Sequence, residues 1–461
     1  MSDYQRVVDG KLTLIPPAGI SSPMPITPLL FPFQANCVQW ALERGRAALF
    51  EDCGLGKTPQ QLEWARQVAE YSKGRVLILA PLAVSQQTVR EGAKFGIPVA
   101  YAREQAEVSE AITITNYERL ERFDASKFSG VVLDESSILK SFIGKTKRLL
   151  VEMFARTPFR LCCTATPAPN DHLELGNHAD FLGVLTSHEM LARWFINDTS
   201  LFGSYRLKGH AVGPFWDWVS SWARCVGRPS DLGAFDDAGF DLPVMQVRRH
   251  TIDVNVTAGR SDSLFRIPDM SATAVHKEKR LTVGERAAKV AELVAAEPHE
   301  PWLIWCETDY EADALAAVIP DAVDVRGSQS LETKEAALIG FVDGSIRVLI
   351  TKPKLAGFGL NFQHCARVAF VGPTFSFEQY YQSIRRVWRF GQMRAVDVHV
   401  VMAATEVSIW DILLRKAEEH REMQAQMFAA VRRAQARGEK HATEYRPTHQ
   451  APLSQWLRRS A

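Results

Sequence analysis

The stretch RAALFEDCGLGKTPQ, residues 46–60, predicts how the first half of the chain folds. A short apolar strand, a loop with Gly54 and Gly56, and a helix that starts near Lys57 and Thr58 form the context of a phosphate-binding loop. Backbone N–H groups at the glycines and the helix N-terminus can face phosphate oxygens, the lysine adds a positive charge, and the threonine hydroxyl suits Mg²⁺. Glu51 stands where the strict pattern has its first glycine, so a capped turn before a helix is the alternative.

A pair of adjacent carboxylates ends an apolar run further along the chain, in GVVLDESS at residues 130–137. Asp134 could hold Mg²⁺ together with Thr58, and Glu135 could orient and deprotonate an attacking water. Such a pair on a surface turn is common, but one that ends a buried strand downstream of a lysine loop is typical of an ATP-hydrolysing site. The sequence therefore predicts ATP and Mg²⁺ as cofactors.

Short apolar runs alternate with segments of helical period on both sides of these motifs, which predicts the α/β class with parallel sheets. The runs fall into two series, RAALF, RVLILAP, AITITN, GVVLDE and RLCCTATP in the first half and PWLIWCET, AVDVRG, IRVLITKP, RVAFVGP and VDVHVVMA in the second. We expect an extended, proline-rich N-terminal arm over 1–30, a first lobe over 31–255, a linker over 256–280, a second lobe over 281–430, and a basic tail over 431–461.

The composition is that of a soluble globular protein, with 46% hydrophobic and 23% charged residues in 461. The formal charge is +1, so a surface for nucleic acid must be local. The seven cysteines include no C-x-x-C pair, the first residues lack a charged start followed by a long apolar stretch, and the longest uncharged apolar run is too short to span a bilayer. We expect a cytoplasmic protein with reduced thiols, no zinc site and no membrane partner.

These motifs, in this order, resemble those of the superfamily-two helicases and translocases, and more closely their Swi/Snf-like branch in the short form found in phages and bacteria. In that branch the loop begins with acidic residues, as it does here with Glu51 and Asp52. The resemblance covers residues 31 to about 425 and implies two RecA-like lobes, with parallel sheets flanked by helices and an ATP cleft between them. It assigns nucleotide binding to Gly54, Leu55, Gly56, Lys57 and Thr58.

Three further segments of the first half resemble family motifs. FPFQ, residues 31–34, resembles the adenine-reading element, in which Gln34 would bond the adenine edge; a helix start with buried aromatics is the alternative. LILAPLAVSQQ and TITNYERL resemble motifs that grip one nucleic-acid strand, which makes Ser85 and Thr115 candidate contacts, although each could cap a helix. In TATPAPND, Thr164 and Thr166 would sense the state of Glu135.

Two segments of the second half also match family patterns. KLAGFGLNF matches Lys-x-x-Gly-x-Gly-x-Asn and makes Lys354 and Asn361 candidate nucleic-acid contacts. QSIRRVWRFGQ matches Gln-x-x-x-Arg-x-x-Arg-x-Gly-Gln and assigns Gln382 to the nucleotide site. Arg386 and Arg389 are one helical turn apart, so they share a face, and by resemblance they point to the γ-phosphate. A solvated basic helix is the alternative, but the apolar residues between the arginines favour a packed segment with at least one arginine finger.

An aromatic-rich insertion near residues 195–245 lacks a clear period. Its row of Trp216, Trp218 and Trp222 could stack on bases, but packing in the core or at the lobe interface is favoured. The eukaryotic members have other segments here, so nucleosome-specific function is not carried over.

The function that this sequence predicts best is DNA-stimulated ATP hydrolysis coupled to translocation on duplex DNA. A conventional helicase that separates DNA or RNA strands is one alternative. A motor subunit of a restriction or modification assembly and an ATP-gated DNA-binding clamp are others. Glu135 and the two arginines argue against a clamp with negligible turnover, whereas protein partners leave few marks in a sequence.

Overall fold

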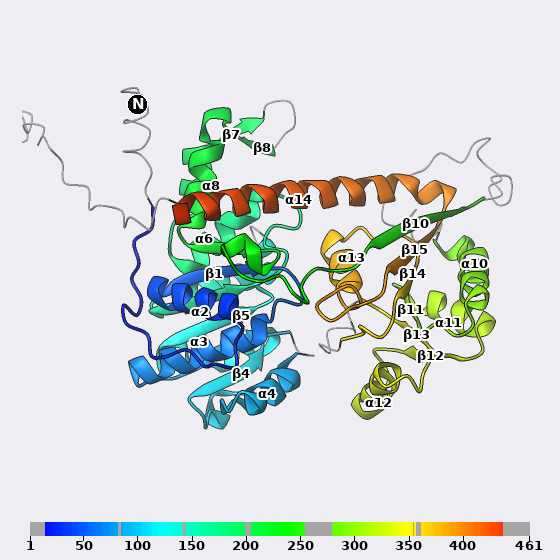
Figure 1. The fold of residues 1–461 in the computed structure, drawn as a ribbon, viewed down its shortest axis with the longest axis horizontal. Helices are drawn as coiled ribbons and strands as arrows, with labels where there is room; N and C mark the ends of the chain where they lie inside the picture. The colour runs from blue at the N-terminus through cyan, green and yellow to red at the C-terminus, as the bar shows by residue number, and fades with distance from the viewer. Residues whose placement is uncertain are drawn as a thin grey trace, which may run out of the picture.

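Two parallel β-sheets form the centres of two lobes in the computed structural model, which describes residues 14–81, 84–141, 144–198, 204–253, 279–353, 355 and 361–436 (Figure 1). The first sheet has seven strands in the order β3-β4-β2-β5-β6-β1-β9, and the second has six in the order β10-β15-β14-β11-β13-β12. Every pairing in both sheets is parallel. The α/β class and the two-lobed organisation predicted from the sequence are confirmed.

The first lobe contains helices on both faces of its sheet. Its strands are β1 (Arg46–Glu51), β2 (Val76–Ala80), β3 (Ala100–Tyr101), β4 (Ile112–Asn116), β5 (Gly130–Asp134), β6 (Phe159–Cys163) and β9 (Ala223–Val226), with a separate antiparallel pair β7 (Phe195–Asp198) and β8 (Ser204–Leu207). Its helices are α2 (Pro32–Arg44), α3 (Lys57–Ser72), α4 (Ser85–Lys94), α5 (Lys145–Met153), α6 (Leu175–Leu182), α7 (Ser187–Trp194) and α8 (Val212–Ser220). Short 3-10 helices are η1 (Gln105–Glu107), η2 (Tyr117–Arg122), η3 (Ala125–Lys127), η4 (Ser136–Lys140), η5 (His172–Glu174), η6 (Gly209–Ala211) and η7 (Pro229–Leu232).

The second lobe repeats this plan with fewer elements. Its strands are β10 (Met245–Ile252), β11 (Trp302–Trp305), β12 (Ala322–Val325), β13 (Val348–Thr351), β14 (Arg367–Val371) and β15 (Val396–Ala403). Its helices are α10 (Val283–Ala296), α11 (Asp309–Val318), α12 (Leu331–Val342) and α13 (Phe377–Ile384), followed by η9 (Ala404–Glu406) and the long α14 (Val407–Ala436).

Alternation along each strand divides its side chains between two cores, as the pleat requires. In β1, Ala48 and Phe50 belong to the core under α6 and α8, whereas Ala47 and Leu49 belong to the core under α2 and α3. The strands are therefore apolar on both faces, which explains why they read as continuous hydrophobic runs. Because all strands of the first sheet run the same way, the loops after β1 and β5 lie on the same side of the sheet, at the carboxyl ends of the strands.

The region expected as an aromatic insertion is largely part of the first lobe. Its segment Ala223–Val226 is strand β9, which pairs with β1 at the edge of the sheet. Trp216, Trp218 and Trp222 are at most 2% exposed and lie in the core, so the core-packing interpretation is confirmed. Strand β10 pairs with β15 of the second sheet over eight residues. The second sheet therefore begins before the boundary predicted at residue 255.

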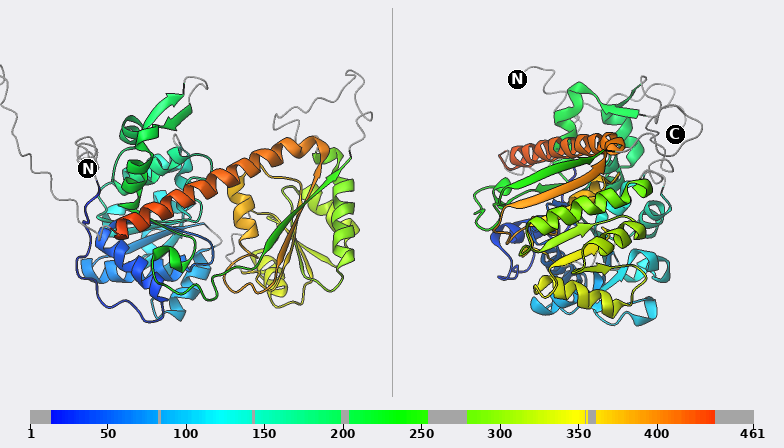
Figure 2. Two further views of the ribbon diagram at one scale, coloured as in Figure 1. Left: turned by 45° about the horizontal axis from the view of Figure 1, so that its top comes forward. Right: turned by 90° about the vertical axis from the view of Figure 1, so that its right-hand side faces the viewer.

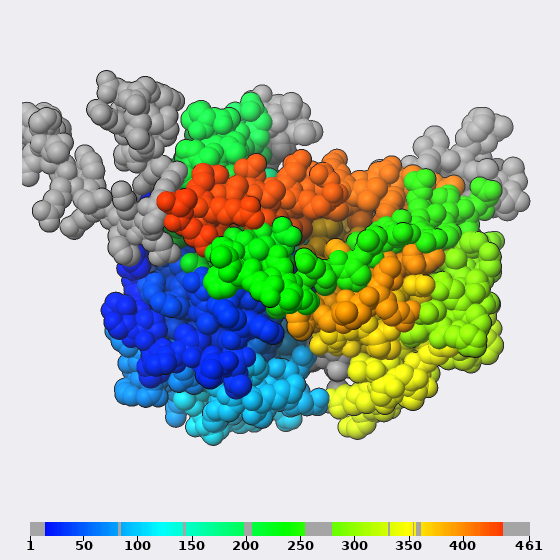
Figure 3. Space-filling model, viewed as in Figure 1, coloured from blue at the N-terminus to red at the C-terminus, as the bar shows by residue number. Residues whose placement is uncertain are grey.

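Helix α14 lies across both lobes (Figures 1, 2 and 3). It has 30 residues and is therefore about 45 Å long. Trp410 and Leu413 pack in the core of the second lobe, whereas Met423 and Met427 pack in the core of the first. The second lobe and the tail thus do not separate at residue 430, because one continuous helix runs from the second lobe onto the first.

The N-terminal arm is described from residue 14, and over residues 14–30 it contains no helix or strand. Backbone hydrogen bonds attach this arm to the first lobe, such as the bond from Ile20 N to Leu42 O at 2.8 Å. The predicted linker and tail lie almost wholly outside the described residues. No helix in the described ranges is long and apolar enough to cross a membrane.

Candidate active site between the two lobes

A cavity of about 370 Å³ lies between the lobes at the edge where β1 and β5 end. Both lobes contribute charged side chains to it. From the first lobe it is lined by Cys53, Gly54, Gly56, Lys57, Thr58, Pro81, Val84, Gln87, Asp134 and Glu135, and from the second by Pro353, Glu378, Gln379, Gln382, Ser383, Arg385, Arg386 and Arg389. The structure thus brings together the phosphate loop, the carboxylate pair and the arginines, although the loop and the arginines are more than 300 residues apart in the sequence.

The phosphate loop runs from the end of β1 to the first turn of α3. Gly54 and Gly56 have φ values of 93° and 78°, in the region that favours glycine. The Lys57 ammonium donates to the carbonyl oxygens of Glu51 at 2.8 Å and Asp52 at 3.1 Å. Lys57 is therefore folded back over the loop and lines the cavity, where its charge can meet a phosphate.

Gln34 is close to the loop but does not line the cavity. Its side chain is 4% exposed, donates to the Leu55 carbonyl at 2.7 Å and accepts from Phe31 N at 2.9 Å. A Cβ added at Gly56 would lie only 2.3 Å from the Gln34 amide nitrogen. In this conformation Gln34 supports the loop, and its role in adenine recognition stays a prediction. Leu55 contributes in the same way, with a buried side chain and a carbonyl that anchors Gln34.

The carboxylate pair follows β5 in a left-handed turn. Glu135 has φ 56° and ψ 57°, a conformation that is uncommon for a residue other than glycine and that is found at strained functional sites. Burial raises the pKa of its carboxyl to about 7, with the neighbouring Asp134 adding to the rise and Lys57 opposing it. A carboxyl with a pKa near neutrality suits a general base.

The neighbours of the pair fix both carboxylates. Asp134 accepts from the Gln61 amide at 2.8 Å, and burial raises its pKa. Glu135 accepts from the Thr164 hydroxyl at 3.3 Å and, across the lobe boundary, from the Gln382 amide at 3.4 Å. Thr166 is buried and bonds Thr164 through its backbone N–H, so of the two threonines only Thr164 touches Glu135.

Thr58 and Asp134 fit a magnesium ion chemically. Hydroxyl and carboxylate oxygens are ligands that Mg²⁺ prefers, and both residues line the cavity. The described residues hold no cluster of three His, Cys, Asp or Glu side chains that could form a metal site. Mg²⁺ usually takes one or two protein oxygens and completes its shell with water and phosphate.

The helical spacing predicted for the arginines of the second lobe is not matched by a regular helix in the structure. Helix α13 ends at Ile384, and Arg386 and Arg389 lie in the turns that follow it. Both nevertheless line the cavity, because bonds such as Arg386 N to Ser383 O at 3.3 Å continue a helical course for one turn. Arg389 is also close to the phosphate loop, since a Cβ added at Gly54 would lie 3.4 Å from the Arg389 Cβ.

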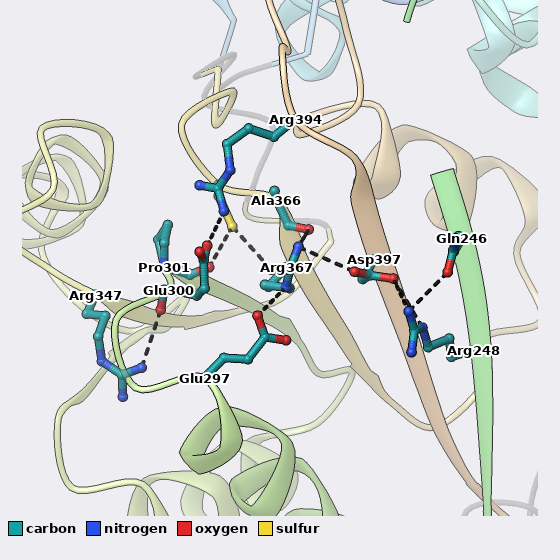
Figure 4. Close-up of polar contacts among 11 residues, drawn as sticks. Gln246, Arg248, Glu297, Glu300, Pro301, Arg347, Ala366, Arg367, Arg394 and Asp397 are labelled. Atoms are coloured by element: carbon teal, nitrogen blue, oxygen red, sulfur yellow. Dashed lines mark hydrogen bonds and ion pairs between the residues drawn. The ribbon is translucent and has the colours of Figure 1, made fainter. Parts of the chain in front are cut away.

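The turn that carries these arginines is anchored within the second lobe. The buried Gln392 amide donates to the carbonyls of Gln363 and Cys365, each at 2.9 Å, and accepts from Arg394 N at 2.9 Å. Arg394 in turn pairs with Glu300, one of several ion pairs at the amino ends of the strands (Figure 4). Gln392 at the end of the motif therefore supports the turn structurally here.

The residues predicted to contact nucleic acid differ in how exposed their side chains are. Ser85 is 1% exposed and Thr115, inside β4, is 0% exposed. Neither hydroxyl reaches the surface in this conformation, because Ser85 begins a packed helix and Thr115 lies within the first sheet. The role of both residues as nucleic-acid contacts stays a prediction. Asn361 is exposed and remains a candidate. Lys354 lies outside the described residues.

Sequence reasoning missed Arg385, which lines the cavity beside the two arginines of the motif. The family pattern leaves this position open, so only its place next to Arg386 could have drawn attention to it. It also missed Gln61, because an amide four residues after Lys57 belongs to no motif.

Two family models match the chain, one for the SNF2-related domain over residues 33–204 and one for the helicase conserved C-terminal domain over residues 285–391. The chain belongs to the Swi/Snf-like helicases of superfamily two. The two matched domains of this Swi/Snf-like protein correspond to its two RecA-like lobes. The expected phage or bacterial origin stays a prediction.

Individual relatives of this Swi/Snf-like protein are more distant. Human TATA-binding protein-associated factor 172 is 26% identical over 227 residues, which covers 41% of this chain and 12% of that protein. The chain thus spans only a small fraction of the length of this relative. The solved Sulfolobus solfataricus SWI2/SNF2 ATPase core in complex with dsDNA is 17% identical, with a TM-score of 0.42 over 91% of this chain and 98% of that chain.

Proposed function

We propose that DNA stimulates ATP hydrolysis by this protein and that hydrolysis drives its translocation along duplex DNA. The observation that carries the proposal is the shared cavity, which Lys57 and Glu135 line from one lobe and Arg386 and Arg389 from the other. A site that is complete only when two lobes meet couples chemistry to their relative motion.

The phosphate loop, the carboxylate pair and the two arginines would each have a role in hydrolysis. Lys57 and the loop amides would bind the β- and γ-phosphates, and Glu135 would take the proton of the attacking water. The arginines would neutralise the charge that develops on the transferring phosphoryl group, for which a guanidinium is well shaped. Bound Mg²⁺, held by Thr58 and Asp134, would stabilise negative charge on the phosphate oxygens.

Gln382 supports the coupling, because it is a second-lobe residue that contacts the proposed base directly. A change in lobe position would alter that contact and the surroundings of Glu135 together. DNA that holds the lobes in the closed arrangement would thus accelerate hydrolysis. Stepping needs only alternating grip on phosphates, which does not require opened base pairs.

The test is steady-state phosphate release measured in parallel with duplex DNA, single-stranded DNA, RNA and no nucleic acid, all at one salt concentration. We expect duplex DNA to give the largest rise in kcat. Glu135→Gln is the control for contaminating ATPases. Equal rates with and without DNA would contradict DNA stimulation, and the largest rise with RNA would make RNA the track.

A further inference from the structure

The phosphate loop is joined directly to the second lobe by one ion pair. Asp52, in the loop, pairs with the guanidinium of Arg385, which follows α13. The side chains are 12% and 6% exposed, so water screens this pair little. The Tyr381 hydroxyl of α13 donates to the same carboxylate.

Arg385 is also held in place by groups of its own lobe. Its guanidinium carbon lies 4.7 Å from the centre of the Trp388 ring and 5.5 Å from that of Tyr381. It also donates to the Trp388 carbonyl at 3.2 Å. Stacking and hydrogen bonding together fix a planar guanidinium. The Arg385 guanidinium can therefore bind the Asp52 carboxylate in one fixed orientation.

Asp52 is equally well fixed on the side of the phosphate loop. Its carboxylate accepts from Cys53 N at 2.7 Å, and its backbone N donates to Val226 O at 2.9 Å. Its carbonyl oxygen accepts from the Lys57 ammonium at 3.1 Å. A movement of Asp52 would therefore shift a carbonyl oxygen that the Lys57 ammonium contacts directly.

We propose that Arg385 is a positioning residue that latches the closed lobes by capturing Asp52, and that the latch sets the distance between the phosphate loop and the arginines at 386 and 389. Arg385 precedes Arg386 in the chain, so docking of its guanidinium fixes the start of the turn that carries both arginines. This inference rests on the proposed ATPase activity and adds a residue that the family pattern leaves open.

The competing role is that of a third arginine acting on phosphate directly, because Arg385 also lines the cavity. The two roles differ in their dependence on Asp52. A latch needs both partners, so removing either one has the same consequence. A residue that contacts phosphate would act independently of Asp52.

A double-mutant cycle separates the roles. Asp52→Asn, Arg385→Gln and the double variant are compared by kcat, KM for ATP and thermal melting, with duplex DNA present. For a latch we expect each single variant to lower kcat by about 10²-fold, the cost of misplacing reacting groups by about 1 Å, with KM little changed. The double variant should be no worse than either single variant. Effects that multiply in the double variant would overturn the proposal.

The control is an arginine–aspartate pair confined to one lobe, with side chains 28% and 52% exposed. Arg347 donates to Asp321 at 2.7 Å and lies at the amino end of β13, whereas the cavity lies beyond the carboxyl end of that strand, at Pro353 (Figure 4 shows Arg347). Arg347→Gln should leave kcat unchanged. If it lowers kcat as much as Arg385→Gln, loss of any such pair would explain the effect, and the latch would be rejected.

A second readout tests the latch without relying on hydrolysis. Fluorophores are attached through an unnatural amino acid at the exposed positions Tyr71 and Val318, one on each lobe. With ADP and beryllium fluoride bound, we expect high energy transfer in the wild-type protein and a lower-transfer, open population in Asp52→Asn and in Arg385→Gln. Unchanged transfer in both variants would overturn the latch. A wild-type protein without ATPase activity would refute the proposed function alone, since the energy-transfer result would still support or overturn the latch separately.

Discussion

At the scale of a single residue, Glu135 is the side chain on which the proposed hydrolysis depends most directly. It combines a left-handed backbone, a buried carboxyl with a pKa near 7 and contacts from both lobes. A strained conformation of this kind costs about 1–3 kcal/mol and persists only where its surroundings impose it. The geometry therefore favours a role as general base over that of a simple structural turn.

Lys57→Ala and Glu135→Gln should both abolish hydrolysis, but for different reasons. Loss of the ammonium should weaken ATP binding, because a charge facing the phosphates disappears. The glutamine keeps the shape of the side chain and loses the base, so it should retain bound ATP. Nucleotide binding and phosphate release, measured for each variant, distinguish the two. Near wild-type hydrolysis by Glu135→Gln would refute its assignment as the base.

The raised pKa of Glu135 also predicts a pH profile. A general base works only when deprotonated, so kcat/KM should fall as the pH drops below about 7, approaching about tenfold per pH unit. The profile is measured with Mg²⁺ in excess and with DNA binding monitored at each pH. A flat profile between about pH 6 and 8 would show that a group with a different pKa limits the reaction.

At the residue scale, the sequence could identify chemical groups but not their exposure. Lys57, Asp134, Glu135 and the two arginines were found because their chemistry requires particular residue types at fixed spacing, and all line the cavity. Burial depends on packing between distant segments, which spacing does not encode. Thr115 illustrates this, since its partner Leu79 in β2 comes from an earlier region of the chain.

At the scale of elements, helix α13 and the turns after it form the face that the second lobe presents to the nucleotide. On the helix, Tyr381 and Gln382 donate hydrogen bonds to first-lobe carboxylates. Beyond the helix, Arg385 pairs with Asp52 of the first lobe. The cavity is also lined by Arg385, Arg386 and Arg389. Because the turn is anchored through Gln392 to the rest of the lobe, it should move as one body with the second sheet.

Arg386→Ala and Arg389→Ala should therefore leave nucleotide binding largely intact and slow turnover. At least one should lower kcat by about 10³-fold or more, the effect expected of an arginine finger. Steady-state kinetics with separate measurement of ATP affinity tests this. A variant that loses affinity and keeps its maximal rate would show ordinary ground-state binding instead.

Periodicity predicted the strands of both sheets well, because buried parallel strands are short apolar runs between helices. It failed for the two-residue strand β3 and for β9, whose four residues follow aromatic helix α8 without a turn signal. It also failed to place β10 in the second sheet, since β10 pairs with β15 about 150 residues later. Pairing over such a distance leaves no local pattern in the sequence.

At the scale of the whole molecule, α14 limits how the lobes can separate. Its C-terminal half is fixed to the first lobe by Arg433, which donates to Asp217 at 2.7 Å, and by apolar packing. Its N-terminal half belongs to the second lobe. Opening of the cavity must therefore occur by rotation about this helix or by its partial release, which favours small, repeated motions over wide separation.

The described residues form two lobes, the hairpin β7–β8 and α14, and none of these stands out as an element that would separate paired DNA strands. Holding one base-pair step open costs about 1.4 kcal/mol of stacking, and a separating element must supply it at every step. Alternating grip on backbone phosphates has no such cost. Translocation on intact duplex DNA is therefore the motion that we propose.

The most direct test of this proposal supplies ATP and compares release of a third strand from a triplex with unwinding of a forked duplex. The account predicts that the wild-type protein displaces the triplex strand, that Glu135→Gln does not, and that the fork stays largely paired. Efficient unwinding of the fork without triplex displacement would contradict the account and make this Swi/Snf-like protein a strand-separating helicase.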